Sequence, residues 1–360
     1  MRTVGVEEEF LLVDLAGRPV GVAAAAVEAA TVERELMEQM LETGTKPCLE
    51  ARELAEQLGA RRRTAALAAR DAGARLVALG TSPLPGTVTV TEDPRYQRMQ
   101  VEFGLTAREQ LTCGCHVHVE VADADEGVAV LDRMGPWLPV LLALSANSPF
   151  WQGEDTGYSS YRSQVWRRWP TAGPTEPFGS AAAYTEVVDA LLASGAALDP
   201  GMVYFDARLS QRYPTVEVRA ADVCLRPQDA LLLAVLVRGL VETSARSAAD
   251  GAPAPRTRAE LLRAAAWRAG RFGLGGTLVH PLTGSPAPAG EVVDALLARL
   301  RPVLDEQGDW ELATALWDDL RVRGNGADEQ RGWARGDLAD VLLHAADATL
   351  LRPPTRIMPS

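Results

Sequence analysis

Three consecutive glutamates near the start of the chain have the spacing of a metal site. In the segment Gly5-Val6-Glu7-Glu8-Glu9-Phe10, a β-strand places Glu7 and Glu9 on one face and Glu8 on the other, because successive side chains alternate. Two neighbouring carboxylates repel each other unless a cation lies between them. Hard divalent ions such as Mg²⁺ or Mn²⁺ take oxygen ligands of this kind. The segment therefore predicts a metal-binding strand; the alternative is an exposed edge strand with solvated glutamates.

A second polar strand is predicted over Cys113–Val121, where polar and apolar residues alternate. His116, His118 and Glu120 share one face of this strand, and the valines between them point to a core. Histidines on a polar face can bind a metal or hydrogen-bond a phosphate. The spacing alone fits a zinc pair as well as a magnesium–nucleotide site, so both interpretations stay open at this point.

Two further segments carry carboxylates that can join such a site. In the expected strand Thr215–Ala220, Glu217 and Arg219 lie on one face. They can form a simple ion pair, or they can set a metal ligand beside a phosphate-binding guanidinium. Glu35 and Glu42 belong to another expected strand, and each taken alone is compatible with an ordinary surface carboxylate.

Candidate anion-binding groups come from two loops. Residues 147–180 are rich in glycine, proline, serine, tryptophan and arginine, a mixture typical of a binding loop held by a scaffold. Arg162, Arg167 and Arg168 are its candidate anion binders. The glycine turn at Gly324–Arg331 begins a helix, where backbone N–H groups can bind a phosphate or the turn can serve only as a cap.

The elements that position these residues indicate an α+β fold. The expected strands are Thr3–Val13, Glu35–Thr43, Cys113–Val121, Met202–Arg208 and Thr215–Ala220, with a short strand ending at Gly80. The expected helices are Leu49–Ala78, Asp125–Ser145 with a break at its prolines, Ala181–Ser194, Gln228–Ser247, Arg256–Ala269, Glu291–Leu300, Trp310–Val322 and Asp337–Leu351. Because buried parallel strands are nearly all apolar and these strands alternate with charge, we predict a mostly antiparallel sheet. One face is polar and forms the site, and helices pack on the other face.

Composition narrows the function classes. The chain has 360 residues and a formal charge of 36 − 48 = −12, which argues against nucleic acid or an anionic membrane as a partner. Lys46 is the only lysine, so an anion site has to be built mostly from arginine. No signal-peptide pattern precedes the first strand, and the longest apolar runs fall short of the roughly 20 residues that span a bilayer. With only four cysteines, we expect a reduced, cytoplasmic protein without a membrane partner.

With these motifs in place, the chain resembles the carboxylate–amine ligase family, also called glutamate–cysteine ligase type 2, whose members have a glutamine-synthetase-like fold. The matching stretches, in the expected order, are Gly5–Phe10, Glu42-Thr43, Cys113–Val119, Leu144–Arg162, Tyr213–Asp222 and Gly324–Arg331. A length of 360 residues alone favours about two domains. One site that draws on both halves of the chain instead implies a single catalytic domain over residues 1–360.

The resemblance implies roles for individual residues around ATP and Mg²⁺, with Mn²⁺ as the alternative ion. The implied metal ligands are Glu7, Glu9, Glu35, Glu42, His116 and Glu217. Arg162 and Arg219 are implied to bind phosphate or the substrate carboxylate during catalysis, and His118, Arg219 and Arg331 to contact the nucleotide. Cys115 and Glu120 depart from the family's usual pattern, and we expect both to lie near the site and to affect substrate choice.

The reaction implied by the resemblance is amide-bond formation in two steps. A substrate carboxylate attacks the γ-phosphate of ATP to give an acyl phosphate and ADP, and an amine then displaces phosphate. Several cations are needed because the phosphate charge must be neutralised and held in line. The family's default partners are a glutamate-like acid and a cysteine-like amine, and a homodimer is one assembly that the sequence allows.

Three other functions compete with this one. A phosphotransferase of related fold would phosphorylate its substrate and stop. A metallohydrolase built on His116 and His118 would act without ATP. The third is a non-catalytic nucleotide-binding protein. The presence of all the implied acidic metal ligands argues against this function.

Overall fold

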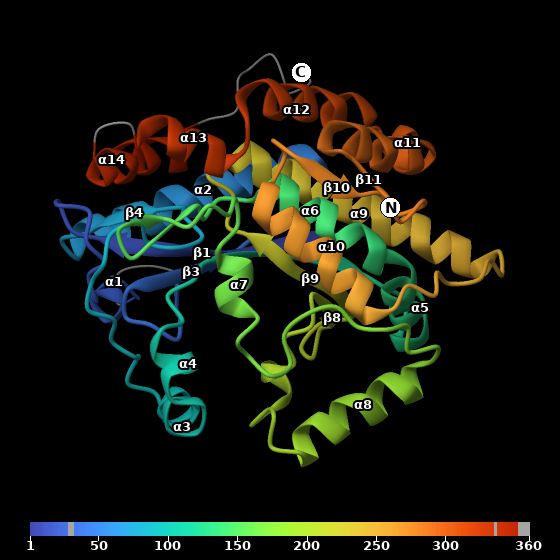
Figure 1. Ribbon diagram of the computed structural model, residues 1–360, viewed down its shortest axis with the longest axis horizontal. Helices are drawn as coiled ribbons and strands as arrows, with labels where there is room; N and C mark the ends of the chain where they lie inside the picture. The colour runs from blue at the N-terminus through green and yellow to red at the C-terminus, as the bar shows by residue number, and fades with distance from the viewer. Residues whose placement is uncertain (28–31, 335–336, 352–360) are drawn as a thin grey trace.

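A mostly antiparallel sheet organises the molecule. The computed structural model describes residues 1–27, 32–334 and 337–351 (Figure 1). Six strands are hydrogen-bonded in the order β2-β3-β1-β5-β9-β8, and β4 pairs with the second half of β1. The strands of this sheet are β1 (Val4–Val13), β2 (Glu33–Arg34), β3 (Met40–Gly44), β4 (Arg75–Val77), β5 (Gly114–Glu120), β8 (Ala207–Leu209) and β9 (Thr215–Asp222). All of its pairings are antiparallel, so the sequence expectation is confirmed.

The remaining elements are mostly helices. The helices are α1 (Ala23–Val27), α2 (Ala51–Asp71), α3 (Pro94–Phe103), α4 (Leu105–Arg108), α5 (Ala124–Met134), α6 (Leu138–Ser145), α7 (Arg162–Trp166), α8 (Ala181–Ala193), α9 (Pro227–Ala249), α10 (Ala259–Phe272), α11 (Ala289–Gln307), α12 (Trp310–Arg323), α13 (Gly326–Trp333) and α14 (Leu338–Thr349). Two short 3-10 helices are η1 (Gly135–Trp137) and η2 (Pro200–Met202), and two small hairpins pair β6 (Phe150–Trp151) with β7 (Glu154–Asp155) and β10 (Thr277–Val279) with β11 (Pro286–Pro288).

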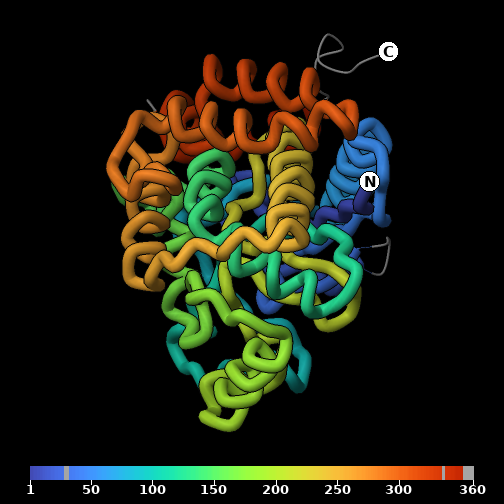
Figure 2. The backbone as a smooth tube through the Cα atoms, turned by 90° about the vertical axis from the view of Figure 1, so that its right-hand side faces the viewer, coloured from blue at the N-terminus to red at the C-terminus, as the bar shows by residue number. Residues whose placement is uncertain are grey.

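The larger group of helices packs directly on one face of the sheet, and the polar side chains of the other face line a cavity. Helices α2, α6 and α9 contact β1, β9 and β5, and α11 and α12 pack on α9 farther from the sheet. Figure 1 shows α11 to α14 above this layer and α3, α4, α7 and α8 below the sheet, and the rotated view in Figure 2 has the same order. The valines of β5 and β9 lie fully buried in the core beneath the helices.

A β-bulge aligns the polar residues of the two central strands. Cys115 lies opposite Ala221 and Val117 opposite Val218, so two residues of β9 face His116. A bulge of this kind adds one residue to one strand and locally redirects its side chains. Here it keeps Arg219 on the polar face, while Ala221 returns to the core.

Three expected elements differ from the structure. Of the expected strand over residues 35–43, only the part from Met40 onward is found, as β3. Glu35 and the residues up to Gln39 lie outside any strand, in a segment that ends in a turn closed by a bond from Met40 N to Met37 O. The helix expected to run to Ala78 ends at Asp71, where Gly73 takes a left-handed conformation with φ of 80° and β4 begins two residues later. Strand β8 starts only at Ala207, after η2 and an extended segment.

The kinked helix expected over residues 125–145 is confirmed as α5, η1 and α6. By length and composition this stretch, 124–145, could cross a membrane, but 78% of its most apolar part is buried inside the protein. It is therefore a core element of the fold. The expectation of one catalytic domain over residues 1–360 stays a prediction.

Candidate active site

The uncovered face of the sheet forms the floor of a cavity of about 1340 Å³. This volume exceeds the roughly 300–1,000 Å³ of common small-molecule pockets, so the cavity has room for more than one ligand. Its floor comes from β1, β3, β5 and β9, and its lower wall comes from α3, the end of α7 and the segment around η2 (Figure 1). Of the ten expected site residues, eight line it: Glu7, Glu9, Glu35, Glu42, His116, His118, Glu217 and Arg219.

Strand register explains why these side chains meet. Glu7 lies opposite His116 on β5, and Glu9 lies opposite Glu42 on β3. His118 is in turn paired with Glu217 on β9. Facing residues on an antiparallel pair share one side of the sheet, so four strands deliver their polar side chains to the same floor.

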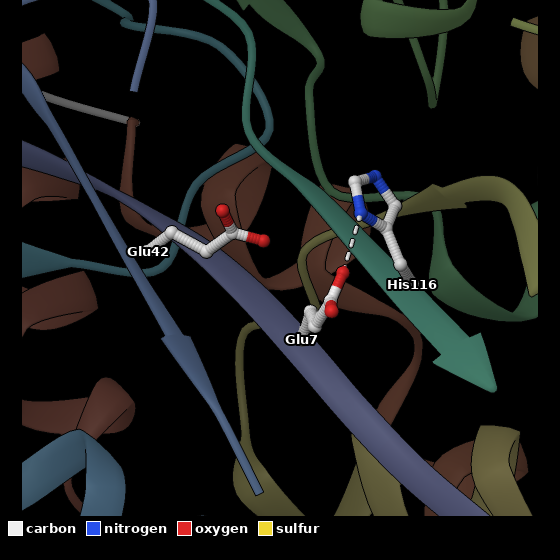
Figure 3. A group of neighbouring side chains, drawn as sticks. All are labelled: Glu7, Glu42 and His116. Atoms are coloured by element: carbon white, nitrogen blue, oxygen red, sulfur yellow. Dashed lines mark ion pairs between the residues drawn. The ribbon is translucent and has the colours of Figure 1, made fainter. Parts of the chain in front are cut away.

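Glu7 is the centre of the arrangement. One of its carboxylate oxygens lies 3.7 Å from His116 Nδ1 and 3.3 Å from His118 Nε2. Figure 3 shows the Glu7 carboxylate between the His116 ring and the Glu42 carboxylate, with side chains from β1, β5 and β3. Burial acts to raise the pKa of Glu7, but its contacts with the two imidazoles outweigh burial and hold the pKa well below its usual value. Burial and the Arg219 charge lower the pKa of His116 to about 4, so at neutral pH Glu7 is ionised and His116 is neutral.

Three further carboxylates crowd the same region. Burial, and next to it the Glu35 carboxylate, raise the pKa of Glu9 to about 7. The same two causes raise the pKa of Glu42 well above its usual value. Glu9 also accepts a hydrogen bond of 2.5 Å from the Gly114 backbone N–H. A raised pKa means that the protein by itself disfavours the ionised form of these carboxylates, a form that a bound cation would favour.

The donor set fits divalent metal ions. One ligand atom each from Glu7, Glu42 and His116 lie within 4.8 Å of one another, and so do atoms of Glu7, His118 and Glu217. The Nε2 atoms of His116 and His118 are buried and have no hydrogen-bond partner among the described residues. Ionised carboxylates and neutral imidazoles are the protonation states that a metal requires. The two histidines fall into different groups, which does not favour a site built on a histidine pair.

Glu217 is held by two arginines. Arg208 donates to it from Nε at 2.7 Å and from Nη2 at 3.2 Å, and Arg219 contributes a second ion pair. Burial acts to raise the pKa of Glu217, but Arg219 and Arg208 outweigh burial and hold the pKa well below its usual value. Arg208 was missed by the sequence interpretation. Its only signal was a place at the end of an expected strand, and the register that sets it opposite Glu217 cannot be inferred from local sequence.

Arg162 lies behind the cavity and does not line it. Its side chain is buried, lies 3.9 Å from Asp222, and places its guanidinium carbon 5.3 Å from the centre of the Trp166 ring. Arg219 lies 5.8 Å from the centre of the same ring. The Nε and Nη2 atoms of Arg162 have no hydrogen-bond partner among the described residues. Its positive charge acts to lower the pKa of Glu9, so it influences the site from beneath.

Arg331 is separated from the cavity. It pairs with Asp155 through contacts of 2.7 and 2.9 Å and donates to the Tyr158 carbonyl, and it lines a different pocket beside Arg271. The first N–H groups of α13 are also used internally, because the Asn325 side chain accepts hydrogen bonds from Ala327 and Asp328. The capping interpretation of this turn is therefore confirmed, and phosphate binding there stays a prediction.

The two departures from the family pattern have different positions. Cys115 points into the core beneath the helices. It precedes His116 in β5 without lining the cavity, and its effect on substrate choice stays a prediction. Glu120 lies at the cavity rim and accepts hydrogen bonds from Thr3 at 3.2 and 2.9 Å.

Comparison with known proteins agrees with this fold. A family model described as glutamate-cysteine ligase family 2 matches residues 3–341. A protein of Frankia alni that is provisionally named glutamate–cysteine ligase 2-2 is 50% identical over 365 residues, covering 95% of each chain. A protein of Streptomyces avermitilis provisionally named glutamate–cysteine ligase 2-1 is 52% identical over 340 residues, covering 92% of this chain and 94% of that one.

Solved structures share the architecture. The glutamate–cysteine ligase of Francisella tularensis, in complex with AMP, superposes with a TM-score of 0.69 at 12% identity, over 99% of this chain and 90% of that one. A bifunctional glutathione synthetase of Pasteurella multocida gives a TM-score of 0.69 at 15% identity, over 97% of this chain and 52% of that one. Both likenesses concern the fold. The family match over most of the chain, together with relatives of about half-identical sequence, shows that this protein belongs to glutamate–cysteine ligase family 2.

Proposed function

We propose that this protein uses ATP to join a small carboxylic acid to an amine, with a glutamate-like acid and a cysteine-like amine as the first candidates. Its family and the provisional names of its relatives support a ligase. The AMP complex of the Francisella tularensis enzyme supports a nucleotide substrate. The observation that carries the proposal is the convergence of carboxylates and imidazoles from four strands on one cavity floor.

The chemistry accounts for this donor set. An oxygen of the acid attacks the γ-phosphorus of ATP, and the bond to the β-phosphate oxygen breaks, which leaves an acyl phosphate and ADP. The amine nitrogen then attacks the acyl carbon, the carbon–phosphate oxygen bond breaks, and an amide, inorganic phosphate and a proton result. No nucleophilic side chain is needed. The protein has to position two reactants and stabilise phosphate charge.

Metal binding is assigned to the acidic floor. We assign Mg²⁺, with Mn²⁺ as the alternative, to oxygen and nitrogen atoms of Glu7, Glu9, Glu35, Glu42, His116 and Glu217. When bound, such ions neutralise phosphate oxygens and hold them in line for displacement. Burial, and next to it the charge of Glu35, raise the pKa values of Glu9 and Glu42. Bound ions would favour the ionised forms of these carboxylates and compensate their mutual repulsion.

Arginines are assigned to anionic groups. Arg219 lines the cavity, and its Nε atom is buried without a hydrogen-bond partner among the described residues, so it can donate to a phosphate or to the substrate carboxylate. His118 stays a candidate for nucleotide contact from the cavity floor. We assign Arg162 to electrostatic support of Glu9 rather than to direct contact, and the position of Arg331 does not support a nucleotide role.

The proposal is tested by ATP turnover with a panel of acid and amine pairs. We expect phosphate release only when ATP, a divalent ion, an acid and an amine are all present, with an amide product in the mass spectrum. Glu7→Gln and Glu217→Gln should abolish this turnover while leaving the protein folded. The substitution Glu154→Gln, at an exposed residue of β7 outside the cavity, is the matched control and should turn over like the wild type.

Other outcomes separate the competing functions. A phosphorylated product that accumulates without an amine indicates a phosphotransferase, and hydrolysis that needs no ATP indicates a metallohydrolase. Unchanged turnover in Glu7→Gln would refute the assigned metal site. We further propose a reducing, cytoplasmic location, because all four cysteines are buried and free of disulfides in the described part of the chain.

A further inference from the structure

The cavity has two unlike ends. Gly5 and Glu9 lie four residues apart on β1, which separates the two ends by about 13 Å. At the Glu9 end the lining is buried and consists of carboxylates and aromatic rings, among them Tyr204 and Trp169. At the Gly5 end the lining is more open. It includes the half-buried Gly5 and Thr45, the exposed Glu120, and the exposed loop between β8 and β9.

An exposed tyrosine stands at the open end. Tyr213 lines the cavity and keeps 57% of its surface exposed. Its ring lies edge-to-face with that of His118, with centroids 6.3 Å apart and an interplanar angle of 89°. Tyr213 is the most exposed aromatic ring in the described part of the chain, and an exposed ring in a polar cavity is a surface that a ligand can cover.

The loop that carries this tyrosine is fixed to the cavity floor. Ser210 N donates to Thr215 O at 2.9 Å and closes the loop, and Pro214 restricts its backbone. The Thr215 hydroxyl lies 3.0 Å from His118 Nδ1, so the loop is attached to the strand that supplies the metal-site histidines. The position of the Tyr213 ring is therefore set relative to His116 and His118 before a ligand arrives.

We propose that Tyr213 stacks on the purine base of the nucleotide and so fixes the direction in which ATP lies in the cavity. This inference rests on the proposed function. A base is neutral and planar, and its faces pack well on an aromatic ring. The rings of Tyr204 and Trp169 at the Glu9 end are buried, whereas the Tyr213 ring is more than half exposed. The side chains of Gln211 and Arg212 on the same loop supply donors for the base edge or the ribose.

The direction follows from the order of residues along the floor. With the base at Tyr213, the triphosphate passes over His118 and Glu7, and the γ-phosphate lies toward Glu9 and Arg219. The acid and amine then occupy the enclosed end beside Tyr204 and Trp166. Water has least access to this end, which protects an acyl phosphate from hydrolysis.

The test compares binding of ATP with binding of tripolyphosphate, which lacks the base and ribose, by calorimetry in the presence of Mg²⁺. Tyr213→Ala should weaken ATP binding by about 5- to 100-fold and change tripolyphosphate binding by less than about twofold. Tyr213→Phe keeps the ring and should bind ATP like the wild type. An ATP analogue with a fluorescent 2-aminopurine base should be quenched by the wild type and much less by Tyr213→Ala.

Each other outcome overturns a defined part of the argument. Equal ATP affinity of Tyr213→Ala and the wild type refutes base stacking, as does an equal loss for ATP and tripolyphosphate. If Tyr213→Ala instead raises the KM of the acid or amine and leaves ATP binding unchanged, the direction of the nucleotide is reversed. If the wild type itself binds neither ATP nor tripolyphosphate, the proposed function fails, and that result is distinct from failure of the stacking assignment.

Discussion

Substitution of Glu8 tests which side chains of β1 face the cavity, because Glu8 lies between two cavity glutamates and points to the opposite side of the sheet. Its side chain is 1% exposed and accepts two hydrogen bonds from Arg62, at 2.6 and 3.0 Å. Arg62 is fully buried and also donates to the carbonyl oxygens of Cys224, Leu225 and Thr349. This pair therefore joins β1 to α2, to the segment after β9 and to the end of α14.

The structure sets the size of the expected effect. Glu8→Gln leaves a buried guanidinium without its counter-charge, and removal of one partner of a buried pair costs about 3–5 kcal/mol. Against a typical unfolding free energy of about 5–15 kcal/mol, this is a large fraction. For a chain of this length the corresponding fall in the thermal midpoint is about 4–7 °C. Urea unfolding followed by tryptophan fluorescence measures the change directly.

A second variant separates the ion pair from packing. The double substitution Glu8→Leu with Arg62→Met removes both charges, so it should be more stable than Glu8→Gln. It should still fall short of the wild type, because three backbone carbonyls lose the donor that Arg62 provides. Glu7→Gln, one residue away, should unfold at close to the wild-type urea concentration and lose activity. Wild-type stability of Glu8→Gln, or lost activity with intact stability, would refute the assignment of opposite faces.

Three other perturbations have defined outcomes. A Cβ at Gly114 would overlap the buried Arg162 guanidinium and lie 3.1 Å from His116 Nε2. Gly114→Ala should therefore lower kcat by about 10²-fold in a steady-state assay, and overpacking should lower the unfolding free energy by about 1–3 kcal/mol in urea titrations. Burial raises the pKa of Asp229 to about 6, against about 3.9 in the unfolded chain. The contribution of this group to the free energy of unfolding is therefore complete below about pH 4 and is lost as the pH rises through 6. Asp229→Asn should remove about 3 kcal/mol of this pH dependence in urea titrations at pH 4 to 8. Mg²⁺ at 100 times its dissociation constant should stabilise the protein by about 2.7 kcal/mol, and EDTA should reverse the resulting rise of the melting temperature. Glu42→Gln should reduce this rise. An equal rise in that variant would exclude Glu42 as a ligand.

Local alternation in the sequence was sufficient to predict the central strands. In β1, β5 and β9 every second residue is apolar or small over most of the strand, and this period depends only on backbone geometry. It correctly separated Glu8 from Glu7 and Glu9, and the valines of β5 from its histidines. The α+β class followed from the same pattern, since strands with one polar face cannot be buried on both sides.

Features that depend on pairing between distant segments could not be predicted in this way. The bulge opposite His116 and the partnership of Arg208 with Glu217 are set by register, which single-strand patterns do not contain. Arg162 and Arg331 illustrate a related difficulty. Both are arginines in polar, glycine-rich segments, the usual composition of anion-binding loops, yet each is already paired with an aspartate in the structure. The composition of a loop predicts that it carries an anion-binding side chain, but it does not indicate which group of the protein or of a ligand that side chain pairs with.

The segments around Arg162 and Arg331 have a structural role that accounts for their polar residues. At the end of β9, the buried Asp222 carboxylate accepts hydrogen bonds from Asn147 N and from the hydroxyls of Ser148 and Ser160. The Gln330 side chain on α13 donates to the carbonyl and side-chain oxygens of Asn147. Burial raises the pKa of Asp222, and these donors act in the opposite direction because they stabilise the ionised carboxylate.

This network fixes the strand that carries Arg219. Asp222 lies only three residues beyond Arg219 on β9, and Asn147 also donates to the carbonyls of Ala78 and Val223. The bulge between these positions leaves β9 without regular pairing opposite His116, where a strand bends easily. Anchoring Asp222 to two loops and a helix therefore holds Arg219 against the cavity floor. Polar segments far apart in the chain thus anchor one strand of the cavity floor through buried hydrogen bonds.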